Sequence, residues 1–164
     1  MAEPLVPDVV VNICHNSVPT GERVPRQWTQ DGNLVMVRLI PCSGKIDLQY
    51  LLHTLEGVRQ GLCVVACPTG TCQLAQGNLR AEVRVRTAQK LLGELGLEPE
   101  RAELLHSSAS DPPGSLERLV RGAVARLASL PPSPLCASPS HPNEKDQKPE
   151  QSGASVQSND ALST

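Results

Sequence analysis

Short apolar runs alternate with amphipathic segments along this chain, and the alternation limits its fold more than any other feature. Four runs are rich in aliphatic residues and short enough to predict buried strands rather than helices. They are Asp8–Cys14, Leu34–Ile40, Leu62–Ala66 and Ala102–His106. The segment between the first two runs, His15–Asn33, holds two prolines, two glycines and many polar residues, and we interpret it as a long loop.

Helical periodicity appears after each of the other three runs. Asp47 is placed to cap a first helix, whose apolar face contains Leu48, Leu51, Leu52, Leu55 and Val58. A second helix is predicted from Gly77 and Asn78 to about Leu95, with an inward face of Leu79, Val83, Leu91, Leu92 and Leu95. Ser115 caps a third helix, whose apolar stripe is Leu116, Leu119, Val120, Ala123, Val124 and Leu127.

This order of elements predicts an α/β fold with a mainly parallel sheet covered by helices. We expect a single domain over residues 1–130, because that length suits one hydrophobic core. The composition changes at Pro131, after which proline, serine, asparagine, glutamine and charged residues dominate. We predict that residues 131–164 form a disordered tail, since they offer little apolar surface to bury.

Charge and hydropathy exclude several classes of function. The formal net charge is −2, which gives no general reason to expect nucleic-acid binding. No apolar run approaches the roughly 18 residues of a membrane-spanning helix, so we expect no transmembrane segment. The segment Met1–Asp8 contains no basic residue and does not resemble a secretory signal, so we expect a cytoplasmic protein. Cytoplasmic thiols stay reduced, and six cysteines there indicate metal or redox chemistry.

Four of the six cysteines follow the predicted strands closely. They are Cys14, Cys42, Cys67 and Cys72. The carboxyl ends of parallel strands meet at one edge of a sheet, so we expect the four thiols to converge there as metal ligands. The remaining two have simpler interpretations: Cys63 lies in mid-strand as a core residue, and Cys136 lies in the tail as a free thiol.

The residues leave three chemistries open for this set. An iron–sulfur cluster is favoured, because the ligands are scattered over a domain already large enough to fold. A structural zinc site is the main alternative, although such sites usually show short Cys-x2-4-Cys knuckles in small modules. A thiol oxidoreductase would need a reactive dithiol at Cys67 and Cys72, but the chain contains no Cys-x-x-Cys motif. Lys45 and His15 are the nearest cations in sequence, and His106 is a weaker candidate ligand.

Specific motifs over residues 8–130 resemble a known family. The motifs are Cys42-Ser43-Gly44-Lys45-Ile46-Asp47, Cys67-Pro68-Thr69-Gly70-Thr71-Cys72, Gly77-Asn78-Leu79-Arg80-Ala81-Glu82 and the stretch Leu91–Arg101. In this order they are similar to the delta (iron–sulfur) subunit of methyl-viologen-reducing hydrogenase, also called the F420-non-reducing hydrogenase iron–sulfur D-subunit family. Cys14 fits the cysteine region near the amino terminus of that family.

The resemblance implies a [2Fe–2S] electron carrier that performs no catalysis itself. Its ligands would be Cys14, Cys42, Cys67 and Cys72. Members of the family pass electrons between a hydrogenase, formate dehydrogenase or other oxidoreductase module and a heterodisulfide-reductase-A-like flavoprotein, often in electron-bifurcating assemblies.

Three departures from the family pattern leave the four cysteines in place. Val11 stands where relatives often have a further cysteine, and the loop after Cys67 differs from the usual Cys-His-Pro-Gly-Asp-Cys. The segment His15–Asn33 also does not look like its counterpart; we expect it to contact the partner, with Trp28 either an anchor of that interface or a lone core tryptophan.

Overall fold

A five-stranded sheet forms the centre of the molecule, and the computed structural model describes it within residues 6–136. The strands are β1 (Val9–Cys14), β2 (Gln27–Gln30), β3 (Asn33–Ile40), β4 (Gly61–Ala66) and β5 (Ala102–His106). Their order is β2-β3-β1-β4-β5, and every neighbouring pair is parallel except β2 with β3. The predicted α/β domain with a mainly parallel sheet is therefore confirmed.

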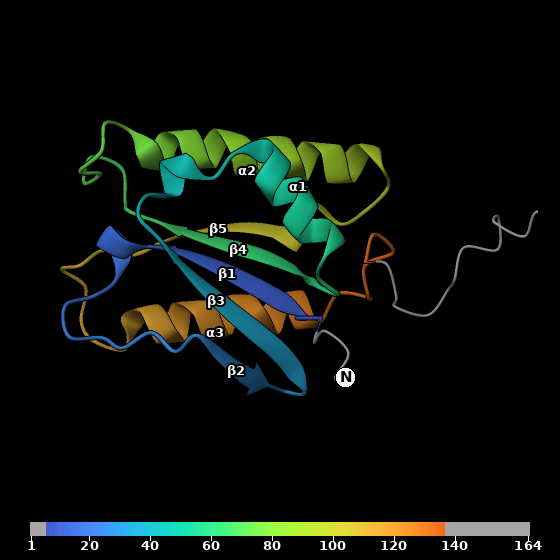
Figure 1. Cartoon of the computed structure of the whole chain (residues 1–164), viewed down its shortest axis with the longest axis horizontal. Helices are drawn as coiled ribbons and strands as arrows, with labels where there is room; N and C mark the ends of the chain where they lie inside the picture. The colour runs from blue at the N-terminus through green and yellow to red at the C-terminus, as the bar shows by residue number, and fades with distance from the viewer. Residues whose placement is uncertain (1–5, 137–164) are drawn as a thin grey trace, which may run out of the picture.

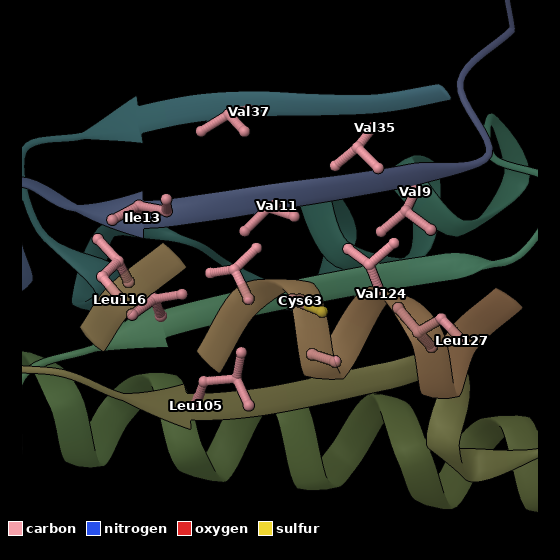
Figure 2. Packing of buried hydrophobic residues seen from close by; sticks show 13 residues of the cluster. Val9, Val11, Ile13, Val35, Val37, Cys63, Leu105, Leu116, Val124 and Leu127 are labelled. Carbon is pink, nitrogen blue, oxygen red and sulfur yellow. The ribbon is translucent and has the colours of Figure 1, made fainter. Parts of the chain in front are cut away.

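Helices cover both faces of this sheet. They are α1 (Leu48–Glu56), α2 (Gly77–Glu94) and α3 (Ser115–Ala128). Helices α1 and α2 lie on one face and α3 lies on the other (Figure 1). Alternate residues of β1 serve the two cores: Val9 and Val11 pack with α3, whereas Val10 packs with α1 and α2. Figure 2 shows the α3 core, in which the sulfur of Cys63 lies among aliphatic side chains.

Strand β2 corrects the prediction that His15–Asn33 is only a loop. Its sequence is polar because it is a short edge strand, so it shows no apolar run. It joins β3 through Asp31 and Gly32, whose φ angles of 51° and 81° are those of a tight hairpin turn. Trp28 lies on this strand against the α3 core, with the guanidinium of Arg121 5.7 Å from its ring centre.

Helix α2 presents a different face to the sheet from the one predicted. Leu79, Val83 and Leu95 are exposed, whereas the buried stripe consists of Gly77, Asn78, Ala81, Val85, Ala88 and Leu92. The spacing of the larger apolar residues is misleading here, because the helix packs through small residues that let it approach the sheet closely. Of the predicted inward residues, Leu92 alone is fully buried.

A buried arginine organises the end of the sheet where the strands begin. Arg101 is 1% exposed and lies directly before β5. Its guanidinium donates to Glu98 Oε2 at 2.8 Å, to the Gln60 carbonyl at 2.9 Å and to the Pro131 carbonyl at 2.8 Å. The charge is thus fully surrounded by acceptors from three separate segments.

The segment after α3 continues across this same end. The amide of Ser133 donates to the Arg59 carbonyl at 2.6 Å, and Leu135 packs against the core beneath α1 and α2. Residues 131–136 therefore lie on the domain, although the predicted tail starts at Pro131; a count of apolar residues overlooks these backbone contacts. The remainder of that tail, residues 137–164, lies outside the described residues. Among residues 6–136, no helix is both long and apolar enough to cross a membrane.

Candidate metal centre

The loops that carry the four cysteines leave the sheet at its carboxyl end. Cys14 is the last residue of β1, while Cys42 and Cys67 follow β3 and β4 closely. These three strands are parallel neighbours, so their ends meet at one edge. The sulfurs of Cys14 and Cys67 are 3.8 Å apart. Two thiolates on one tetrahedral metal lie about 3.8 Å apart when the metal–sulfur bonds are about 2.3 Å.

Cys42 and Cys72 form a second pair, which packs against the start of α2. The Cys42 side chain lies close enough to Cys72 to help lower the pKa of the Cys72 thiol. A Cβ atom on Gly77 would lie 2.5 Å from the Cys42 sulfur and 3.4 Å from the Cys72 sulfur. Glycine at this position therefore leaves the space that both sulfurs occupy.

The two pairs influence each other electrostatically. Burial, together with the neighbouring Cys14, Cys72 and Cys42 thiols, raises the pKa of Cys67 to about 12. Partial burial also opposes ionisation of Cys72, but hydrogen bonds to the backbone of Leu74, Asn78 and Gly77 and to Cys42 outweigh it and lower the pKa of Cys72. A bound cation would offset the mutual repulsion of four thiolates. The four thiols thus lie close enough to influence one another's pKa, but among residues 6–136 no three His, Cys, Asp or Glu side chains are grouped to hold one ion, and the ligand set stays a prediction.

The other two cysteines lie elsewhere. Cys63 is fully buried in the α3 core, where burial and the nearby Glu103 raise the pKa of its thiol. Cys136 follows Ser133, whose backbone contacts Arg59 at the opposite end of the sheet. Neither residue is placed to join the four.

Three polar residues beside the sulfurs contact backbone instead of sulfur. The ring nitrogen Nδ1 of His106 lies 3.2 Å from the Cys67 carbonyl oxygen. Asn78 donates to the carbonyls of Cys67 and Pro68, and Arg84 donates to the carbonyls of Gly44 and Ile46. Asn78 and Arg84 were not predicted as site residues from the sequence. Asn78 belongs to a motif quoted above, whereas Arg84 sits in a basic helix face that gives no sequence signal of this role.

Comparison with known proteins assigns this chain to a family. The family model described as "Methyl-viologen-reducing hydrogenase, delta subunit" matches residues 9–130. The chain is 36% identical over 103 residues to the iron-sulfur D-subunit of the F420-non-reducing hydrogenase vhu of Methanocaldococcus jannaschii, which covers 63% of this chain and 76% of the relative. It is 32% identical over 98 residues to the protein of the same name from Methanococcus maripaludis, covering 60% and 72% respectively.

A second group of relatives is much longer. The chain is 30% identical over 79 residues to the A-subunit of the Ferredoxin:CoB-CoM heterodisulfide reductase of Methanosarcina mazei. That match covers 48% of this chain and only 10% of the reductase protein, so the shared region is a small part of a large protein. The match over residues 9–130 and the identity to the hydrogenase iron-sulfur proteins confirm the resemblance noted in the sequence. The chain belongs to the methyl-viologen-reducing hydrogenase delta-subunit family.

Proposed function

We propose that this chain is the [2Fe–2S] electron-transfer subunit of a multi-subunit oxidoreductase complex and catalyses no reaction alone. The single observation that carries the proposal is the meeting of Cys14, Cys42, Cys67 and Cys72 at one edge of the sheet, with 3.8 Å between the sulfurs of Cys14 and Cys67. Family membership supports it, since the relatives are named iron-sulfur subunits.

We favour a cluster with two iron atoms over one zinc ion, and the relatives named iron-sulfur subunits support this choice. A four-cysteine zinc site needs its sulfurs around a single point. Among the described residues, no three His, Cys, Asp or Glu side chains are grouped so that one ion could be held by all of them. A [2Fe–2S] cluster with four cysteines takes two on each iron, and the 3.8 Å between the sulfurs of Cys14 and Cys67 suits one such pair.

The chain supplies the environment for single-electron chemistry when such a group is bound. The cysteines hold it, and the backbone around Cys72 directs N–H groups that stabilise anionic sulfur. Arg84 and Lys45 line a cavity next to Cys42, so positive charge lies beside the site. Positive charge and N–H donors favour the more negative, reduced form of a cluster.

For partners, we propose one protein on each side of the relay. The donor side is a hydrogenase, formate dehydrogenase or other dehydrogenase module, and the other is a heterodisulfide-reductase-A-like flavoprotein. The relatives' names include both a hydrogenase and that reductase, which supports this assignment. Coupling to electron bifurcation forms part of the same proposal.

Purification without oxygen tests the cofactor directly. We expect equal amounts of iron and acid-labile sulfide, with a visible charge-transfer absorption that bleaches on reduction by dithionite. Substituting Cys14, Cys42, Cys67 or Cys72 by serine should remove the absorption, whereas Cys63→Ser, as the matched control, should keep it. Stoichiometric zinc without visible absorption would contradict the proposal and support the structural alternative.

A further inference from the structure

Arg84 links helix α2 to the loop that carries Cys42. Its Nη1 atom donates to the Gly44 carbonyl at 2.8 Å and to the Ile46 carbonyl at 2.6 Å. The side chain is only partly exposed, although Arg80, one turn earlier on the same helix face, is exposed. Arg86, two residues along, shows the usual arrangement instead: it is exposed and pairs with Glu82 on its own helix at 2.6 Å. Arg84 therefore binds the Cys42 loop, whereas Arg86 forms an ion pair on the surface of its own helix.

Asn78 makes the corresponding link to the loop that carries Cys67. It is 3% exposed, and its Nδ2 atom donates to the Cys67 carbonyl at 3.2 Å and to the Pro68 carbonyl at 2.9 Å. The first turns of α2 thus hold both cysteine loops by their backbone oxygens. A buried amide with two acceptors fixes a loop without touching the sulfur.

Close backbone contact makes these links possible. A Cβ atom on Gly44 would lie 2.5 Å from the Gly77 Cα, so the Cys42 loop rests directly on the start of α2. Glycine at position 44 permits this approach, and glycine at position 77 leaves room for the Cys42 sulfur. Arg84, which lies seven residues along the helix from Gly77, then reaches back over the loop to its carbonyls.

We propose that Arg84 and Asn78 are positioning residues that hold the backbone of the Cys42 and Cys67 loops in place before any metal is bound. The inference rests on the proposed function only for the nature of the group that the cysteines later receive. The planar, permanently charged guanidinium suits this task because two of its N–H bonds can point to two carbonyls at once. Pre-formed loops leave less ordering to be done when the metal arrives.

Hydrogen exchange in the reduced, metal-free chain tests this directly. The amides of Lys45 and Ile46 close the turn after Cys42, through the carbonyls of Cys42 and Ser43. We expect Arg84→Met to speed their exchange by about tenfold or more, as the loss of a charge-assisted hydrogen bond predicts. Arg84→Lys should give an intermediate rate, since the charge remains but the side chain is shorter. The matched control Arg86→Met should leave both amides at the wild-type rate.

Two further readouts complete the test. Asn78→Ala should speed exchange at Thr71, whose amide donates to the Pro68 carbonyl, while leaving Lys45 unchanged. After loading, Arg84→Met should release its metal faster than the wild-type chain. Wild-type exchange at Lys45 and Ile46 in a folded Arg84→Met protein would overturn the inference; if that variant does not fold, wild-type exchange in Arg84→Lys overturns it equally. These exchange rates are measured without metal and do not depend on which metal binds. A failure of the [2Fe–2S] proposal can therefore be told apart from a failure of this inference.

Discussion

The two ends of the sheet bury polar groups in opposite ways. At the amino end, the Arg101 guanidinium meets a carboxylate and two carbonyls, so the chain itself satisfies the charge completely. At the carboxyl end, the buried thiols of Cys14 and Cys67 face each other, and burial and neighbouring sulfur raise the pKa of Cys67 and keep its thiol protonated at neutral pH. The first arrangement is complete as folded, whereas the second becomes favourable for thiolates only with an added positive charge.

This difference separates a structural from a functional use of buried polar groups. A satisfied buried charge contributes to the fold and needs nothing from outside. A cluster of ionisable groups that the chain leaves uncompensated marks a place where a ligand enters. Two substitutions test whether the two ends can be perturbed independently, and a third tests a buried thiol that lies at neither end.

The largest effect is expected at the amino end. Arg101→Met removes the donor from the Glu98 carboxylate and from the Gln60 and Pro131 carbonyls, and we expect the free energy of unfolding to fall by about 3 kcal/mol. Urea unfolding of the metal-free chain measures this. Arg126→Met, which removes an exposed pair with Glu103, is the control and should change stability by less than about 1 kcal/mol. Equal effects of the two variants, or loss of metal binding in Arg101→Met, would show that the two ends of the sheet do not act independently.

A smaller loss of stability with a greater loss of function is expected at the carboxyl end. Gly77→Ala places a Cβ atom 2.5 Å from the Cys42 sulfur, so we expect about 2 kcal/mol of destabilisation and loss of most bound metal. Gly93→Ala in the same helix is the control, because its Cβ meets only Pro99 at 3.7 Å. That variant should keep its metal and gain slightly in stability from helix propensity. Metal analysis beside thermal unfolding separates the outcomes, and full metal content in Gly77→Ala would refute the expected crowding.

The smallest effect concerns Cys63, a buried thiol that belongs to neither end. Its pKa is raised above the ordinary 9.0 by burial, so the folded chain binds this proton more tightly than the unfolded chain. The stabilisation is complete below pH 9 and is lost as pH rises further, by about 1 kcal/mol at pH 10. Cys63→Ala should therefore show a shallower decline of unfolding free energy between pH 8 and pH 10. Parallel pH profiles for the two proteins would contradict this.

Most of the fold could be predicted from the sequence because the central strands are buried on both faces. Strand β4 is buried at every residue, so its apolar run is unambiguous. Strand β2 could not be found in this way, since Gln27–Gln30 is polar, but the Asp31-Gly32 pair before an apolar run is a hairpin signal that the loop interpretation ignored. The rotation of α2 was not predictable from its large residues, because Ala81 and Ala88 decide which face packs.

The candidate site also contains residues that could be predicted from the sequence and residues that could not. The cysteines were predictable because thiols at the ends of parallel strands must meet at one edge. The residues that hold their loops were not, because Asn78 and Arg84 act on carbonyl oxygens, and every residue of a loop carries one. A side chain that binds backbone leaves no pairing pattern in a single sequence.

Arg59 gives the domain one further property. Its amide donates to the Pro7 carbonyl at 3.2 Å and its carbonyl accepts from Ser133 at 2.6 Å, so the first and last parts of the described chain are joined through one residue. Ends that meet in this way allow a domain to be inserted into another polypeptide or to be circularly permuted. A short linker between residues 6 and 136, with new termini opened in the exposed turn at Gly21, should give a permuted protein with its cysteine loops intact. The domain is in this sense a module that a larger chain could carry without cutting the loops that bear Cys14, Cys42, Cys67 and Cys72.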